Sequence, residues 1–476
     1  MTTLTRVRFF LLGLALLTAA LASAHAAAPA ARPPNVLLLM TDEHNSRIMG
    51  CAGDKVVKTP TLDNLAATGI RFTSAYCQNP ICTPSRVALV SGRIPSNIGT
   101  FGNGNQQKYP DITTLADLFT KAGYAAHWYG KTHWGDPRFQ NNRERGGMQR
   151  PDYEEQEAAF SRLPQDSVVS PWPVEQNSDH ITANEAVAFL DQVKDKPFFL
   201  GVSLIKPHFP FSIQQKYYDM YKGKVGLPHA PAKLIAELPS LAKEEREKYK
   251  HAEATNEDIL RAREMYYGMV TYADEEMGRV VKKLEELGLR ENTIIIYTTD
   301  HGEMLGDRGI WYKNTFFEGS AGIPFIWSFP KALPKGQVVR APAMNMDVLP
   351  TLAELCGLPQ PSGVEGTSLV PVMRGTDDGA KRIALSENFR GNFAGRMIRT
   401  AEWKYFFYTS GEDYLYNLRA DSGEETNLVK DPKHQALVAD LKQRASAGWV
   451  QKQRGIREIV GAGDGEPVPK KVKKKK

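Results

Sequence analysis

Cys82 lies in the pentapeptide Cys82-Thr83-Pro84-Ser85-Arg86, directly before an apolar run with helical spacing. Pro84 suits the first turn of a helix, where a missing backbone N–H costs nothing. Cys82 is therefore expected at a helix N-terminus, where free N–H groups and the helix dipole favour an anion. Arg86 adds a permanent cation with a planar set of donors. These features make Cys82 a candidate nucleophile beside an anion site, and a buried structural cysteine is the ordinary alternative.

Two acidic residues, Asp42 and Glu43, closely follow the continuous apolar run 36–40. Such a run is typical of a strand that is buried on both faces. A carboxylate just past a buried strand is costly unless it binds something. Asp42 is therefore a candidate metal ligand, and a helix cap or a solvated turn is the alternative.

Lys131 and His133 follow the strand expected at 125–129. Residues two apart in an extended chain face the same side, so this pair can point into one pocket. His208 follows a second apolar strand, 198–204, and lies between two prolines. A surface lysine and structural histidines are the ordinary alternatives.

The pattern Cys82-x-Pro84-Ser85-Arg86 resembles the signature of type I sulfatases, in which the cysteine is oxidised to Cα-formylglycine. The continuation at 89–95 is similar to the small-Gly-Arg-x-Pro run of that family. The motifs are closest to those of the choline-sulfatase and phosphonate monoester hydrolase branch of the alkaline-phosphatase superfamily.

The resemblance implies a set of site residues. The implied metal ligands are Asp42, Cys82, Asp300 and His301, the implied catalytic residues are Cys82, Arg86, Lys131, His133, His208 and Lys313, and Asn103 is an implied substrate contact. The metal is Ca²⁺ by analogy, and Mn²⁺ or Mg²⁺ is compatible with the same kinds of ligand. Glu43 stays open as a ligand, because family members differ at that position.

The implied activity is that of a sulfuric ester hydrolase, which releases inorganic sulfate from a sulfate monoester. Formylglycine, hydrated to a gem-diol, would attack sulfur and form a covalent sulfo-enzyme, with Arg86 and Lys131 holding nucleophile and sulfate. His208 and Lys313 would help the leaving oxygen depart as general acid and cation, and His133 would assist the release of sulfate. A formylglycine-generating or anaerobic sulfatase-maturing enzyme is the implied partner.

Two other functions are compatible with the same residues. Related branches hydrolyse phosphonate monoesters or phosphodiesters with the same constellation. A catalytically inactive protein that binds sulfated polymers is the alternative from another class, and the complete set of implied catalytic residues argues against it. Choline sulfate is one candidate substrate, whereas export favours a sulfated carbohydrate.

Strands that alternate with helices over 35–375 predict an α/β catalytic domain with a mostly parallel sheet. The motifs follow the carboxyl ends of strands, where such sheets bind ligands. The resemblance implies an alkaline-phosphatase-like sheet sandwiched by helices. Short strands followed by a helix predict a small antiparallel-sheet-plus-helix subdomain at 376–455.

Both ends of the chain differ from this body. Residues 1–26 have basic, apolar and small-residue segments in the order of a signal peptide, which predicts export to the periplasm or the extracellular space. No later segment is long and apolar enough to span a bilayer. The Gly-, Pro- and Lys-rich segment 456–476 is expected to be a disordered tail.

Composition excludes two classes of protein. Of the net charge of +6, six positive charges come from lysines among the last seven residues and two from Arg6 and Arg8, which leaves −2 for the rest. A nearly neutral body argues against a nucleic-acid-binding fold. The four cysteines are too few for a disulfide scaffold, and a Cys51–Cys77 pair remains open.

Overall fold

A computed structural model of the chain describes residues 32–103, 112–133, 163–390, 393–447 and 449. The predicted signal peptide at 1–26, the predicted tail at 456–476 and the segment 134–162 lie outside the described residues. Residues 1–34 and 35–476 form separate units, and the second contains every described helix and strand. The described helices include none with the length and apolar character that a membrane crossing requires.

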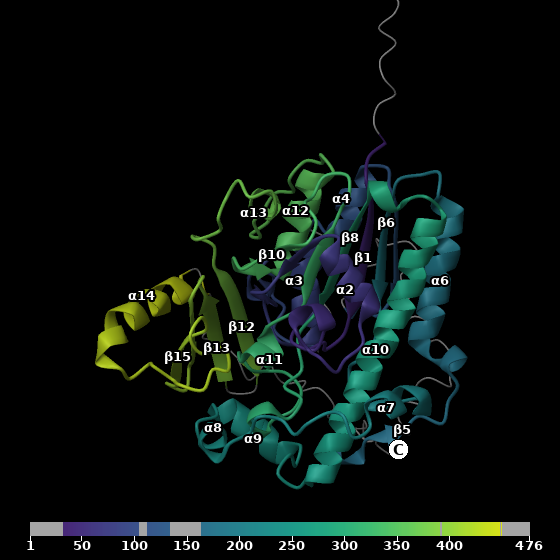
Figure 1. The fold of residues 1–476 in the computed structure, drawn as a ribbon. Helices are drawn as coiled ribbons and strands as arrows, with labels where there is room; N and C mark the ends of the chain where they lie inside the picture. Colours follow the sequence, from purple (N-terminus) through teal and green to yellow (C-terminus); the bar gives the residue numbers. More distant parts are fainter. Residues whose placement is uncertain (1–31, 104–111, 134–162, 391–392, 448, 450–476) are drawn as a thin grey trace, which may run out of the picture. The chain divides into compact units, whose positions relative to one another are not determined.

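Within the described residues, the central sheet contains seven strands in the order β10-β2-β9-β8-β1-β6-β4 (Figure 1). The strands are β1 Asn35–Thr41, β2 Ile70–Phe72, β4 Ala125–Gly130, β6 Phe198–Ser203, β8 Thr293–Thr299, β9 Phe325–Ser328 and β10 Gln337–Val339. Strand β9 pairs antiparallel with β2 and β8, and the other neighbours pair parallel. The predicted mostly parallel sheet is therefore confirmed.

The two faces of this sheet bury alternate side chains of β1. Val36, Leu38 and Met40 pack with residues of α3 Cys82–Ser91, α4 Leu115–Lys121 and α12 Val348–Leu355. Leu37 and Leu39 pack with residues of α2 Pro60–Ala67, α6 Ser178–Val193 and α10 Asn256–Glu286. Because side chains alternate across a strand, a continuous apolar run serves both faces. The sheet is thus sandwiched by helices, as predicted.

Helix α3 begins at Cys82 and is buried along its whole length. Ile81 precedes it in an extended conformation, and the helix ends at Gly92, whose φ of 66° is left-handed. Glycine adopts this conformation without the steric penalty of a Cβ atom. The helix therefore places Cys82 at its N-terminus, inside the protein.

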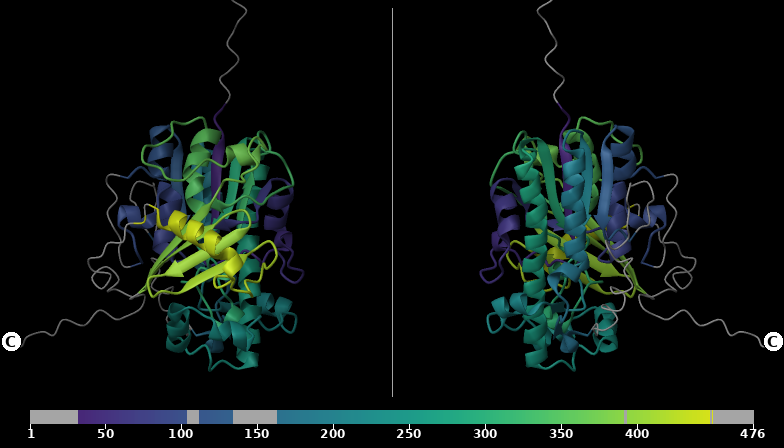
Figure 2. Two further views of the ribbon diagram at one scale, coloured as in Figure 1. Left: turned by 90° about the vertical axis from the view of Figure 1, so that its left-hand side faces the viewer. Right: turned by 90° about the vertical axis from the view of Figure 1, so that its right-hand side faces the viewer.

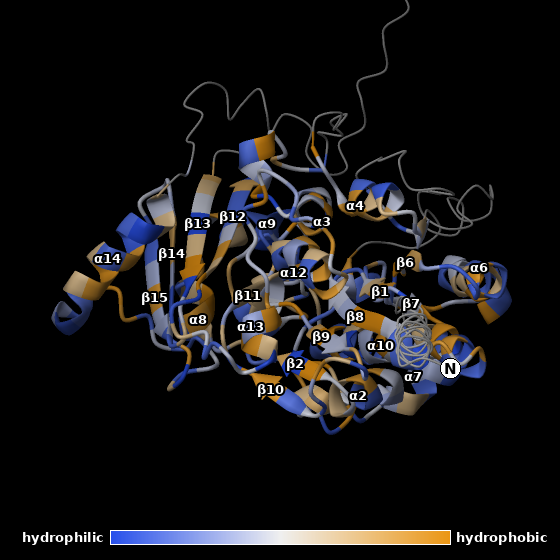
Figure 3. Ribbon diagram, turned by 90° about the horizontal axis from the view of Figure 1, so that it is seen from above, coloured by the Kyte–Doolittle hydropathy of each residue, from blue (hydrophilic) through white to orange (hydrophobic). Residues whose placement is uncertain are grey.

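A separate four-stranded antiparallel sheet follows in the chain, with the order β12-β13-β14-β15. Its elements are β12 Ala384–Arg390, β13 Phe393–Arg399, β14 Trp403–Tyr408, β15 Asp413–Asn417 and α14 Gln435–Ser446. Helix α14 packs Leu441 and Ala445 against one face of the sheet, and the other face contacts Phe316 and Phe317. The left view of Figure 2 shows this sheet and α14 in front of the central sheet. Figure 3 shows hydrophilic and hydrophobic residues alternating along α14.

Shorter elements connect these layers. They are β3 Ala75–Tyr76, β5 Val168–Val169, β7 Ser212–Ile213, α7 Gln215–Tyr221, α8 Ala232–Ala236, α9 Ser240–Lys248, α11 Glu318–Ala321, β11 Ala343–Met344 and α13 Val370–Met373. All four cysteines are free thiols, so Cys51 and Cys77 are not paired.

Candidate active site

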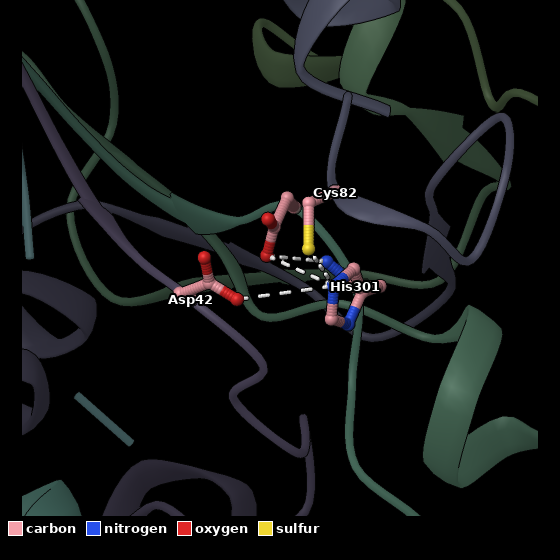
Figure 4. A group of neighbouring side chains, drawn as sticks. Asp42, Cys82 and His301 are labelled. Atoms are coloured by element: carbon pink, nitrogen blue, oxygen red, sulfur yellow. Dashed lines mark hydrogen bonds and ion pairs between the residues drawn. The ribbon is translucent and has the colours of Figure 1, made fainter. Parts of the chain in front are cut away.

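The candidate site lies where neighbouring parallel strands end. Asp42 follows β1, Lys131 follows β4 and Asp300 follows β8. Carboxyl ends of parallel strands share one edge of the sheet, so these side chains meet there. Cys82, the first residue of α3, joins them, and Figure 4 shows Asp42, Cys82 and His301 converging.

Arg86 links the ends of these strands. Its Nη2 donates to Asp42 Oδ2 at 2.9 Å, and its Nε donates to Asp300 Oδ2 at 2.8 Å. Its Nη1 donates to Ser203 Oγ at 2.9 Å and to the Lys131 carbonyl at 2.8 Å. The side chain is fully buried. Each of its nitrogens is thus bound to protein, which favours a positioning role for Arg86 over the predicted contact with sulfate.

Four buried residues offer ligand atoms that lie within 4.8 Å of one another, namely Asp42, Cys82, Asp300 and His301. His301 Nδ1 lies 3.0 Å from the Gly302 carbonyl and donates to it, which leaves the Nε2 lone pair facing this group. Nε2 lies 3.8 Å from Asp42 Oδ1 and 3.7 Å from Asp300 Oδ1. Within the described part of the chain, Asp42 Oδ1 has no hydrogen-bond partner.

These observations fit a divalent metal ion. A buried carboxylate oxygen without a partner needs a positive charge, and an oriented imidazole lone pair is a usual metal ligand. Carboxylate and imidazole donors suit Ca²⁺, Mg²⁺ or Mn²⁺. The ligand set predicted from the sequence therefore converges in space.

Two lysine ammonium groups and the His301 ring surround the Cys82 thiol. Its Sγ lies 3.3 Å from Lys313 Nζ, 3.3 Å from His301 Nε2 and 3.9 Å from Lys131 Nζ. Burial raises the pKa of the Cys82 thiol, but Lys131, Lys313, His301 and a hydrogen bond from His133 outweigh it and hold this pKa well below its usual value. The surroundings of Cys82 thus stabilise a negative charge on its side chain.

Lys313 and His208 form a hydrogen-bonded pair beside this thiol. The distance from Lys313 Nζ to His208 Nε2 is 2.9 Å, and because lysine has only donors, His208 Nε2 accepts. The other ring nitrogen of His208 donates to the Phe209 carbonyl. Burial and the neighbouring Lys313 lower the pKa of His208 to about 3. In this arrangement His208 is neutral, and Lys313 carries the proton.

Glu43 also points into the site. Its Oε2 lies 3.4 Å from both Lys313 Nζ and His208 Nε2. Its backbone φ of 65° is left-handed. Tyr266 Oη donates to its carbonyl at 2.6 Å, and its N–H donates to Asp300 Oδ1 at 3.2 Å, which together fix this conformation. Burial raises the pKa of Glu43 well above its usual range, against the effect of Lys313.

Asn103 meets the site at the first turn of α3. Its Oδ1 accepts a hydrogen bond from the Thr83 N–H at 2.9 Å. Thr83 Oγ1 donates to the His133 carbonyl at 3.0 Å. His133 has a left-handed φ of 66°. The two segments that carry Asn103 and His133 are thus tied to the residue after Cys82.

Several residues of the site were missed by the sequence reasoning. Ser203 ends the buried strand β6, and a small polar residue at the end of an apolar run was the available signal. Asn345 donates to Ser85 Oγ at 2.7 Å, and Ser85 Oγ donates to the Asp300 carbonyl. No pattern in the sequence points to Asn345, because its partner is 260 residues away.

Comparison with known proteins defines the class. Residues 34–358 match the family model for sulfatases, and residues 306–451 match the model for the C-terminal region of N-sulphoglucosamine sulphohydrolase. The ulvan-active sulfatase of Formosa agariphila is 32% identical over 86% of this chain and 79% of that protein. The choline-sulfatase of Rhizobium meliloti is 27% identical over 87% of each protein.

Solved structures agree on the architecture. The phosphonate monoester hydrolase of Agrobacterium radiobacter superposes with a TM-score of 0.77 and 24% identity, over 86% of this chain and 94% of that one. The fold is therefore that of the alkaline-phosphatase-like hydrolases. The chain belongs to the sulfatase family. It is a sulfuric ester hydrolase.

Proposed function

We propose that this enzyme releases inorganic sulfate from a sulfated carbohydrate, with a formylglycine derived from Cys82 as its nucleophile. The observation that carries the proposal is the convergence of Cys82 with the Asp42, Asp300 and His301 cluster and with Lys131 and Lys313. The similarity to an ulvan-active sulfatase supports a carbohydrate as the carrier of the sulfate ester.

When formed, the hydrated aldehyde supplies an oxygen nucleophile that a thiol cannot. Lys131 Nζ lies 3.9 Å from the nucleophilic atom and neutralises the anionic sulfate group that must approach it. His133, whose side chain helps to lower the pKa of Cys82, is assigned the role of taking a proton from the second hydroxyl of the hydrated aldehyde. Lys313 carries the proton that the leaving oxygen needs, and His208 holds the Lys313 ammonium in place by accepting its hydrogen bond.

Asp42, Asp300 and His301 would hold the metal ion, with Glu43 as a candidate additional ligand through its Oε1, which has no hydrogen-bond partner among the described atoms. We assign Ca²⁺ by analogy with the family. When bound, the ion supplies positive charge that lowers the pKa of a hydroxyl group and polarises the sulfate oxygens.

Removal of the metal is expected to abolish turnover and to lower the Tm. The buried carboxylates of Asp42 and Asp300 would then repel each other, with Arg86 as their shared counter-ion. At a metal concentration a hundred times its Kd, the lost stabilisation is about 2.7 kcal/mol. Turnover and melting after dialysis against a chelator, followed by separate addition of Ca²⁺, Mg²⁺ and Mn²⁺, measure the effect and identify the ion. The variant His301→Ala should respond weakly to the chelator. An unchanged Tm and full turnover in metal-free protein would contradict the assignment.

Peptide mass spectrometry across Cys82 tests the nucleophile. Conversion of cysteine to formylglycine lowers the peptide mass by about 18 Da, because sulfur and two hydrogens are exchanged for one oxygen. Protein made together with a maturation enzyme is expected to carry the modification and to turn over an aryl sulfate. Protein made without that enzyme should fold with an intact thiol and lose roughly a thousandfold or more in kcat, as should Cys82→Ala. Full turnover by the thiol form would refute the proposal.

Burial of Cys82 bears on its maturation. The residue is 1% exposed, so a maturation enzyme has no access to it in the folded protein. We therefore propose that modification precedes folding. Together with removal of residues 1–26 during export to the periplasm or beyond, this requires the modification to occur before or during export.

Phosphonate monoester or phosphodiester hydrolysis is the rival activity, since the fold is shared with a phosphonate monoester hydrolase. The ratio of kcat/KM for an aryl sulfate to that for an aryl phosphodiester decides between the two. A ratio above one supports the sulfatase, and a ratio well below one supports the rival. Absence of turnover on every ester by the modified, metal-loaded protein would support a binding protein instead.

A further inference from the structure

A pocket of about 720 Å³ lies beside the edge strand β10 and its neighbour β2, and residues of the C-terminal region, among them Arg399 of β13, complete its wall. Figure 3 shows β2 and β10 side by side at that edge. The pocket contains none of the candidate catalytic or metal-binding residues. Its charged residues are Arg47, Arg71, Arg340, Arg399 and Arg419 against Glu318 and Asp378. The wall is therefore strongly cationic.

The acidic residue Glu318 does not neutralise the arginines of this wall, because its carboxylate already forms an ion pair with Lys404. Lys404 Nζ lies 2.8 Å from Glu318 Oε1, and Tyr76 Oη donates to the same oxygen at 2.9 Å. Burial opposes the ionisation of Glu318, but Lys404, Arg399 and Arg47 outweigh it and lower its pKa to about 2. Arg399 belongs to this network, since its Nε donates to Tyr76 Oη at 3.0 Å.

Three other arginines keep their guanidinium groups available. Within the described ranges of the chain, Arg71, Arg340 and Arg419 form no ion pair and no side-chain hydrogen bond. They come from three separate places, namely β2, the residue just after β10, and the turn after β15. Unpaired arginines around a concave surface raise its positive potential, and their planar donors match the oxygens of sulfate and carboxylate groups.

We propose that this arginine pocket binds a polyanionic carbohydrate chain through sulfate or carboxylate groups other than the ester that is hydrolysed. Three unpaired guanidinium groups around such a volume suit a ligand with several anionic groups better than a single ion. Arg47 lies five residues after Asp42, so their Cα atoms are at most about 18 Å apart. The pocket therefore lies close to the active site in the fold. The identity of the ligand rests on the proposed function, whereas anion binding does not.

The test compares two triple variants in the full-length, metal-loaded protein, each in a Cys82→Ala background so that no ester is cleaved. One variant is Arg71→Gln, Arg340→Gln and Arg419→Gln. The control is Lys121→Gln, Lys196→Gln and Lys282→Gln, which removes the same charge from exposed sites away from the pocket. Calorimetry with a dextran sulfate oligosaccharide is expected to give a Kd about tenfold higher for the arginine variant and within twofold of the parent for the control.

Other probes separate the possible ligands. Uncharged dextran should not bind. Equal affinity of parent and arginine variant for dextran sulfate would overturn the proposal. A tenfold loss with inorganic sulfate alone would show a single-ion site, and an equal loss with a DNA oligonucleotide of the same charge would show a general polyanion site. Either result overturns the carbohydrate assignment. If the triple variant does not fold, Arg340→Gln and Arg419→Gln, both exposed, carry the same comparison.

Activity measurements keep this proposal apart from the proposed function. With Cys82 restored and modified, the arginine variant should keep the parent's kcat/KM on a small aryl sulfate and show a raised KM on a sulfated oligosaccharide. If the parent hydrolyses no sulfate ester, the proposed function fails, and the calorimetric comparison still decides the pocket.

Discussion

The variant Arg86→Ala is expected to lose about 3–5 kcal/mol of unfolding free energy and all measurable turnover. The guanidinium is fully buried between Asp42, at 2.9 Å, and Asp300, at 2.8 Å. Its removal leaves two buried carboxylates without their shared counter-ion, which is far more costly than the loss of an exposed ion pair. Denaturant unfolding in the presence and absence of metal measures the loss, and added metal should restore part of it.

Two control variants test whether the effect of Arg86→Ala comes from its position between the two carboxylates. Arg382→Ala removes the arginine that lies 2.7 Å from the buried Asp347 carboxylate, outside the candidate site. It should lose stability but keep the kcat/KM of the folded enzyme. Arg86→Lys keeps the charge but not the set of donors that reaches both carboxylates, so it should be more stable than Arg86→Ala and still nearly inactive. Stability of Arg86→Ala within about 1 kcal/mol of the parent would contradict the counter-ion role.

The parts of the fold that sequence predicts are those with strong local patterns. Residues 36–40 and 294–297 are continuous apolar runs, and both lie in strands in the middle of the sheet. Because ligand sites follow the carboxyl ends of parallel strands, Asp42 and Asp300 can be paired from their positions in the sequence, although 258 positions separate them. Strand β12 has no such pattern, since its buried residues include Glu387 and Asn388, and it was not predicted.

The roles of the site residues depend on contacts that no local pattern encodes. The motif identifies Arg86, but only the structure reveals that its donors are used by Asp42, Asp300 and Ser203. Likewise, the hydrogen bond from Lys313 to His208 is established by their 2.9 Å separation in the structure and not by either motif. Both contacts depend on the directions of side chains from separate segments, which the positions of the strands do not determine.

The variant Lys313→Ala is expected to lose on the order of 10²–10⁴ in kcat on an alkyl or sugar sulfate and much less on a nitrophenyl sulfate. Departure of an alkoxide needs a proton, whereas a nitrophenolate leaves without one. Lys313 carries the available proton, since its Nζ donates to His208 Nε2. The comparison of kcat for the two esters, with parent and variant at the same metal occupancy, isolates this proton from other effects of the lysine.

The same lysine also lies 3.3 Å from Cys82 Sγ and 3.4 Å from Glu43 Oε2, so it can act on sulfate instead of the leaving group. In that case kcat would fall equally for both esters, which would contradict the leaving-group role.

His208→Ala provides the matched comparison, because it keeps the Lys313 ammonium and removes only the acceptor that orients it. It should show the same dependence on the leaving group with a smaller loss. Lys282→Ala, an exposed lysine of α10, should leave both rates unchanged. On the sugar sulfate, kcat should be lowest for Lys313→Ala, intermediate for His208→Ala and highest for the parent. On the nitrophenyl ester the three values should be nearly equal. A lysine proton donor that is oriented by a neutral histidine requires this pattern.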